Sequence, residues 1–150
     1  MNIESAIKNN NPLPLSSRTV INIMYTARQV EENASLVFKA HGLTPQQYNV
    51  LRILRGQKGN PANLSTIQDR MIDKSSNTTR LIDKLIQKEY VKRQICNKNR
   101  RKIEVFITPN GLELLKNLDP IIEQTNNDIM ERLSNDEKEK LNTLLDKLRD

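Results

Sequence analysis

The chain has 150 residues, with one cysteine and one histidine. This length fits about one domain with a real core, and a lone cysteine excludes an internal disulfide framework. One cysteine and one histidine also give no cluster at metal-ligand spacing, no secretion signal or membrane span is apparent, and we therefore expect a cytoplasmic protein without a metal or cofactor.

The net charge of +6 is distributed unevenly along the chain. Residues 51–102 carry a balance of +10, whereas residues 119–150 carry −4. Positive charge concentrated in one part of a folded domain predicts a polyanionic partner for that part.

Apolar residues recur at helical spacing from Arg18 onwards and predict one long helix that ends near Gly42. A second helix begins after Thr44, with Pro45 at its first position and Gln47 completing a capping box. Its apolar positions continue until Gly56. Two consecutive helices are therefore well signalled.

Two further helices follow in close succession. Ser65 and Gln68 have capping-box spacing and predict the start of a short third helix. A fourth helix is expected to begin around Asp73, with Asp73, Ser75 or Ser76 as its cap and only a tight turn before it. Its start, "KSSNTTR", is rich in short polar side chains.

The next segment alternates apolar and polar residues in "YVKRQICN" and "KIEVFITP", which predicts a β-hairpin with "NKNRR" at its tip. Thr108 and Pro109 then open another helix, expected to bend or break at Pro120. A capping box from Ser134 to Glu137 starts the last helix. The predicted fold is mainly α with a small β-wing, namely a winged helix-turn-helix flanked by N- and C-terminal helices.

In a helix-turn-helix, the start of the second helix lies in the DNA major groove. Asn77, Thr78 and Thr79 are mediocre helix formers, and capping alone does not explain three of them in succession. We therefore expect base or phosphate contacts from this turn and helix. The predicted contact residues are Ser75, Ser76, Asn77, Thr78, Thr79, Arg80 and Lys84.

The basic hairpin tip has two interpretations. Its charges could simply protect a solvated strand edge from aggregation. Beside a recognition helix, however, we favour Arg100 or Arg101 in the minor groove and Lys98 and Lys102 on flanking phosphates. Aromatic residues are few and scattered, which favours duplex DNA over single-stranded RNA.

The segments "LTPQQYNVLRIL", "SSNTTRLIDKLIQKEYVKR" and "NRRKIEVFITPNG" resemble the MarR (multiple antibiotic resistance regulator) family of bacterial transcription factors, from about residue 18 to the C-terminus. By this resemblance the family's wing arginine corresponds to Arg101. The family's wing aspartate, which helps to orient the wing, is replaced by Asn99. An asparagine can still accept a hydrogen bond from Arg101.

The resemblance implies a homodimer that binds the two half-sites of a pseudo-palindromic operator. Residues 44–109 would form the DNA-binding part, and residues 17–42 and 110–150 the helical dimerisation part of a single domain, 1–150. The sequence supports a dimer independently, because a winged domain alone would not bury the apolar residues of the C-terminal helices. These residues are Ile121, Ile122, Ile129, Leu133, Leu141, Leu144, Leu145 and Leu148.

The resemblance further implies a repressor that a small phenolic or anionic effector releases from DNA. Cys96 lies in the wing, so a packed thiol is favoured over a redox sensor, and His41 is expected to be a helix-end residue rather than a ligand contact. Neither a phosphate-binding glycine loop nor a catalytic set is present, so we do not expect an enzyme. The alternative function is a winged-helix module that docks on an acidic protein.

Overall fold

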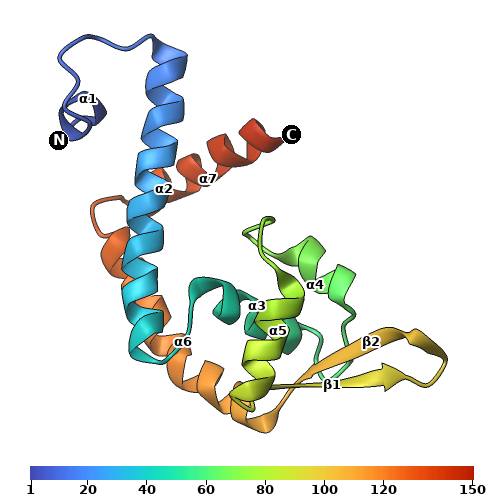
Figure 1. Cartoon of the computed structure of the whole chain (residues 1–150). Helices are drawn as coiled ribbons and strands as arrows, with labels where there is room; N and C mark the ends of the chain where they lie inside the picture. Colours follow the sequence, from blue (N-terminus) through green and yellow to red (C-terminus); the bar gives the residue numbers. More distant parts are fainter.

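The computed structural model describes all 150 residues and contains seven helices and a two-stranded antiparallel sheet (Figure 1). The elements are α1 (Ile3–Ala6), α2 (Leu15–Ala40), α3 (Pro45–Gly56), α4 (Leu64–Arg70), α5 (Thr78–Gln87), β1 (Val91–Cys96), β2 (Asn99–Ile107), α6 (Pro109–Ile129) and α7 (Asn135–Arg149). This confirms the expected fold class. None of the helices combines the length and the apolar composition that crossing a membrane requires.

Helix α2 forms a long rod, and the compact part made of α3, α4, α5 and the wing lies on one side of its lower end (Figure 1). The predicted capping box of α3 is present, since Thr44 Oγ1 accepts from Gln47 N at 3.1 Å and Gln47 Oε1 accepts from Thr44 N at 3.2 Å. Between the two helices Gly42 has φ +70°, a conformation that suits glycine and ends α2.

One continuous core joins the compact part to the helices beside it. It extends from Phe38 at the end of α2, through α3, α4, α5 and the sheet, to Leu115 and Leu118 of α6. The chain beyond Leu118 contains no buried residue. Most of the burial that defines the fold is therefore within residues 38–118.

The helix-turn-helix differs from the expectation at two caps. The N-cap of α4 is Asn63, whose Oδ1 accepts from Thr66 N at 2.8 Å, so the predicted cap at Ser65 is wrong. The N-cap of α5 is Asn77, whose Oδ1 accepts from Arg80 N at 3.1 Å, rather than any of the three residues proposed for it. Both segments offer several adjacent capping residues, and local sequence does not choose among them.

The connection between α4 and α5 is also longer than the predicted tight turn, because residues 71–77 separate the two helices. Met71, at the start of this connection, is buried in the core. The amide of Ile72 donates to Asn49 Oδ1 of α3 at 2.8 Å. The seven residues therefore form an ordered loop that is hydrogen-bonded to α3.

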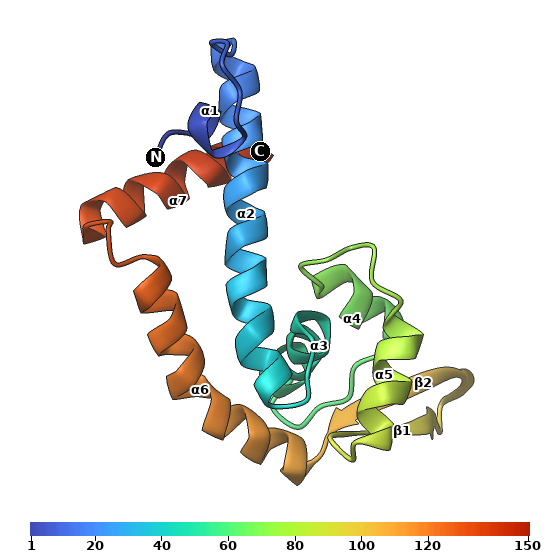
Figure 2. The same cartoon turned by 60° about the vertical axis from the view of Figure 1, so that its left-hand side comes forward.

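Helix α6 continues through Pro120 and ends at Ile129, so it is not interrupted, but it curves along its length (Figure 2). The predicted capping box opens α7, with Ser134 N donating to Glu137 at 2.7 Å. The short helix α1, which the sequence did not signal, folds back on α2 and buries Ile3. An ion pair between Glu4 and Arg18, at 2.8 Å, fastens it there.

Candidate nucleic-acid interface

The start of α5 is held in place from within the protein. Gln68 of α4 donates from Nε2 to the carbonyl of Lys74 at 2.8 Å and accepts from the hydroxyl of Thr78. Thr78 is buried, and its side chain therefore joins α4 to α5. Asn77 caps the helix at the same point. The sequence predicted that Asn77 and Thr78 contact DNA. In the structure, both side chains instead hold the start of α5 in place.

A carboxylate organises the loop before α5. Asp73 Oδ1 accepts from the amide of Ser75 at 3.0 Å and from its hydroxyl at 2.6 Å. Hydrogen bonds from Ser75, the side-chain one first, lower the pKa of Asp73 below its ordinary value. At neutral pH the loop therefore carries a negative charge that repels a phosphate from its immediate surroundings and leaves the neighbouring cations to attract one.

The seven predicted residues of this region separate into two groups. Thr78 is buried, Asn77 is the helix cap, and Ser76 has a buried hydroxyl without a hydrogen-bond partner. The other group has solvent-exposed side chains and consists of Ser75, Thr79, Arg80 and Lys84.

An open hollow of about 290 Å³ lies between the beginning of α3 and the beginning of α5. Its walls include Thr44 and Gln46 from the α3 side, Arg80 and Lys84 of α5, and Asp73 of the loop before α5. Neither Arg80 nor Lys84 belongs to any of the five ion pairs of the chain. The hollow thus brings two cations that belong to no ion pair together with amide and hydroxyl groups and the Asp73 carboxylate. Arg80 and Lys84 favour a phosphate oxygen there, whereas Asp73 opposes one close to it.

The wing is a hairpin with a two-residue turn, Asn97–Lys98, so most of the predicted "NKNRR" tip lies in β2 instead. Cys96 pairs with Asn99, and the next pair is Ile95 with Ile103. Residues 100–102 are therefore extra residues on β2, which form a bulge. This bulge presents three consecutive cations, all exposed.

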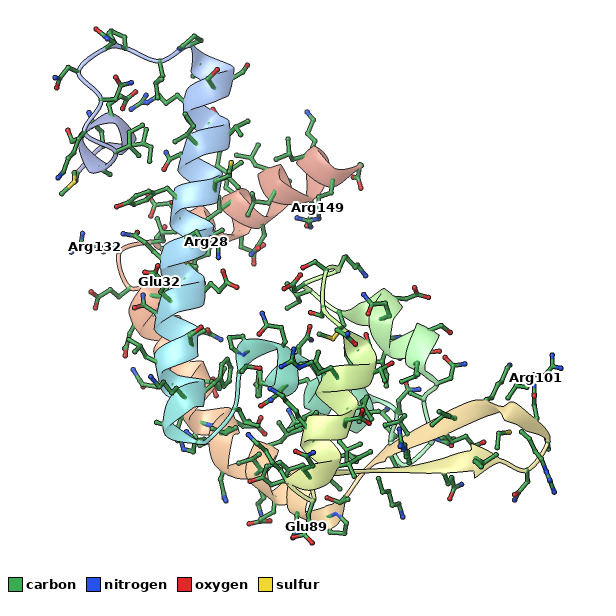
Figure 3. All side chains as sticks on the ribbon, viewed as in Figure 1. Arg28, Glu32, Glu89, Arg101, Arg132 and Arg149 are labelled. Atoms are coloured by element: carbon green, nitrogen blue, oxygen red, sulfur yellow. The ribbon has the colours of Figure 1, made fainter.

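The tip of the wing lies far from the helical body, with Arg101 at its end (Figure 3). The side chain of Asn99 accepts a hydrogen bond from the backbone amide of Arg101 at 3.1 Å. Asn99 therefore contacts the backbone of Arg101 and not its guanidinium group. Four wing cations are exposed and outside every ion pair, namely Lys98, Arg100, Arg101 and Lys102.

The base of the wing is tied to α5 by an ion pair that the sequence reasoning missed. Arg93 Nη1 of β1 lies 3.2 Å from Asp83 Oδ1 of α5. On the other face of the sheet, the ammonium of Lys92 lies over the ring of Phe106, 5.5 Å from its centre. No local sequence pattern predicts the Arg93–Asp83 pair, because it depends on how β1 is oriented relative to α5.

Two candidate residues remain, one in the wing and one at the end of α2. Cys96 is half-buried in β1. His41 follows the last turn of α2, and its Nδ1 lies 3.1 Å from the carbonyl oxygen of Val37. That position is the helix-end position expected for it. The chain contains no group of three histidine, cysteine or acidic side chains arranged to hold a metal ion.

A short helix, an ordered loop, a second helix with exposed cations and a basic two-stranded wing define a winged helix-turn-helix DNA-binding protein. The model of the MarR family matches residues 43–103 of the chain. The chain also resembles the uncharacterized HTH-type transcriptional regulator YkoM of Bacillus subtilis, with 32% identity over 80% of this chain and 77% of that protein. This chain belongs to the MarR family of transcription regulators.

Two solved structures are similar to this chain, the first in sequence and fold and the second in fold. The MarR transcription factor from Planctomyces limnophilus is 30% identical, with a TM-score of 0.71, and the match covers 91% of this chain and 98% of that one. BpsR of Bordetella bronchiseptica has a TM-score of 0.80 at 23% identity, over 93% of this chain and 99% of that one, and its structure concerns the regulation of its DNA binding by 6-hydroxynicotinic acid. The relatives are transcription regulators rather than enzymes.

Proposed function

We propose that this regulator acts as a homodimeric repressor that binds a pseudo-palindromic operator and is released from it by a small-molecule effector. The observation that carries the proposal is a set of six exposed cations on the winged helix-turn-helix that no carboxylate neutralises. They are Arg80, Lys84, Lys98, Arg100, Arg101 and Lys102.

The two groups of cations would have different tasks on DNA. Arg80 and Lys84 lie on α5, so in the major groove they would reach a guanine edge or a phosphate. Ser75 and Thr79 would add short hydrogen bonds. The bulged strand would bring Arg100 or Arg101 to the minor groove, with Lys98 and Lys102 on the flanking phosphates. Asn77 and Thr78 would support this contact indirectly by holding the start of α5.

The proposal of a homodimer is supported by apolar surface that the single chain leaves uncovered. Helix α7 buries none of its residues. Its exposed leucines lie at helical spacing, at positions 141, 144 and 148, and α6 adds Ile121. Exposed apolar side chains along one helix are a common sign of an interface, and a second copy would cover them with the same surface.

The repressor role is proposed because regulators of this family are typically repressors. The effector is proposed by analogy with BpsR, for which 6-hydroxynicotinic acid regulates DNA binding. That molecule is aromatic and acidic, and a phenolic or anionic effector is proposed for this chain. Such a molecule would release DNA by binding more tightly to a form of the dimer that cannot bind both half-sites.

The proposal is tested by selecting bound fragments from the source genome and measuring their affinity across a salt series. Specific binding should weaken steeply with salt, with a log-log slope close to the number of phosphates contacted. Sedimentation of the same protein should give a dimer. Failure to select any fragment at any salt, or a monomer as the only species, would contradict the proposal and favour the module that docks on an acidic protein.

The contribution of the two basic groups is tested with Arg80→Ala and Arg101→Ala. Each should weaken operator binding by about 1–3 kcal/mol per half-site, and loss of one phosphate contact in each half-site should reduce the salt slope by about two. Lys140→Ala in α7 is the matched control, since it removes the same charge from a surface outside the proposed contact. Equal losses in all three variants would mean that only net charge matters.

A further inference from the structure

Helix α3 of the DNA-binding part is joined to α6 by an ion pair with two hydrogen bonds. Arg55, in the last turn of α3, places Nη1 at 2.8 Å from one carboxylate oxygen of Asp119 and Nη2 at 3.0 Å from the other. The two residues are 64 positions apart. Parallel bonds of this kind fix the relative orientation of the two groups as well as their distance.

No other ion pair of the chain has this geometry or this location. Two pairs are local, within α2 and within α7. A third fastens α1 to α2, and a fourth joins α5 to the wing through a single contact between Arg93 Nη1 and Asp83 Oδ1. Only the Arg55–Asp119 pair connects the DNA-binding part to the C-terminal helices. Hydrogen bonding to Asp119 is also the main reason why the pKa of Arg55 is raised.

The pair lies where α6 leaves the core. Leu118 is the last buried residue of α6, and Asp119 follows it directly. The next residue is Pro120, which has no amide hydrogen to donate to the carbonyl four residues earlier. The helix is therefore least supported by its own hydrogen bonds just after its last fully buried residue, where only the partly buried Ile122 still packs against the core. A side-chain contact at this point can determine the direction in which the rest of α6 continues.

The distal part of α6 then acts as a lever. From Asp119 to Ile129 the helix advances by about 15 Å, so a change of about 10° in its direction moves the far end by about 3 Å. Half-sites on DNA are read at a separation of about 34 Å, one helical turn, or a multiple of it. Shifts of this size at a dimer interface would misplace one recognition helix relative to the other.

We propose that the Arg55–Asp119 pair is a positioning contact that fixes the direction of α6 relative to the DNA-binding part and thereby sets the separation of the two recognition helices. The second half of this inference rests on the proposed dimer. The side chains are 36% and 48% exposed, and exposed pairs add little to folding stability. The pair therefore acts on geometry, and its removal leaves the fold intact.

The positioning contact is tested without DNA by measuring distances between spin labels on α5 and α6. Labels at Gln87→Cys and Asn127→Cys, in a Cys96→Ser background, report the angle between the two parts. Dilution with unlabelled chain keeps one labelled copy per dimer. Arg55→Ala and Asp119→Ala should each broaden the distance distribution, and the charge-swapped Arg55→Asp/Asp119→Arg chain should narrow it again. Arg149→Ala, which removes a pair within α7, is the control.

The consequence for DNA is tested with a fragment selected by the wild-type protein and derivatives of it that carry one to five extra base pairs at the centre. The ratio of affinities for the original and lengthened fragments cancels the general effect of charge. Each alanine variant should lose about tenfold of this discrimination, and the charge swap should recover it. Thermal unfolding should stay unchanged throughout.

Two results would overturn the inference. One is a distance distribution that is unchanged in both alanine variants. The other is a distance distribution in the charge-swapped chain that stays as broad as in either alanine variant. A wild-type protein without any spacing preference would instead count against the proposed function and the DNA half of this inference. The label distances would then still decide whether the pair positions α6.

Discussion

The DNA-binding part and the C-terminal helices of this regulator are organised in opposite ways. Residues 43–118 contain most of the buried core and carry the positive charge, whereas residues 119–150 bury nothing and are acidic. The first region is ordered by contacts within its own chain. The second shows an apolar helix face that the single chain leaves exposed. If the proposed dimer covers this face, stability in this molecule has two sources, one independent of protein concentration and one dependent on it.

The largest expected effect tests this division directly. Leu115 is fully buried in the shared core, so Leu115→Ala should lower the free energy of unfolding by about 2–5 kcal/mol. Leu148 is 68% exposed, so Leu148→Ala should act only through association. Denaturant unfolding at two protein concentrations separates the cases. A loss for Leu148→Ala that does not vary with concentration would break the comparison.

The start of α6, inside the first region, gives the next effect. A Cβ on Gly111 would lie 2.5 Å from the carbonyl oxygen of Tyr90 and 2.7 Å from Ile107 Cγ1. Gly111→Ala should therefore destabilise the protein by about 1–3 kcal/mol through overpacking. Gly56→Ala is the matched control, because nothing lies within 4 Å of its Cβ. Equal thermal unfolding of the two variants would show that the start of α6 is looser than described.

Asn77 sharpens the comparison within the DNA-binding part, because it separates a structural role from a DNA contact. Asn77→Ala should destabilise the protein by about 0.5–2 kcal/mol through loss of the α5 cap. Asn77→Ser keeps a capping oxygen and should retain stability. Operator affinity, measured for both variants, should follow stability. A stable Asn77→Ser protein that no longer selects its operator would show that the amide reads DNA.

The smallest effect concerns the loop before α5. Ser75 lowers the pKa of Asp73. The ionised carboxylate therefore contributes to folding stability, and this contribution is complete above the ordinary pKa of about 3.9. The contribution is lost as the pH falls through the lower folded value. A carboxyl-carbon NMR titration should give a midpoint below the ordinary value, and Ser75→Ala should raise it. Thr79→Ala, which removes an exposed hydroxyl that makes no hydrogen bond to Asp73, should leave the midpoint unchanged.

The sequence was sufficient for the two helix starts that have a complete capping box. Thr44, Pro45 and Gln47 define the start of α3, and Ser134 and Glu137 define the start of α7. Each of these caps uses residues within one turn of one another, so their spacing carries the information.

Features that depend on distant partners could not be predicted in this way. Gln68 has capping-box spacing from Ser65, but its side chain reaches Lys74 and Thr78 instead. The Arg55–Asp119 pair joins residues from opposite halves of the chain. The bulge in β2 likewise needs the register of both strands. The sequence therefore predicted which residues are basic and where they cluster, but not how the wing presents them.

The base of the wing has a third backbone partner, because Ala62 forms an isolated antiparallel bridge with Val105 of β2. Ala62 and Val105 exchange both backbone hydrogen bonds, at 3.0 and 2.8 Å, and both residues are buried. Their amide protons should be among the slowest in the chain to exchange with deuterium, while those of residues 100–102 should exchange quickly. The wing would thus be rigid at its base and compliant at Arg100 and Arg101. In the proposed complex, the tip could then adapt to minor grooves of different width without moving α5.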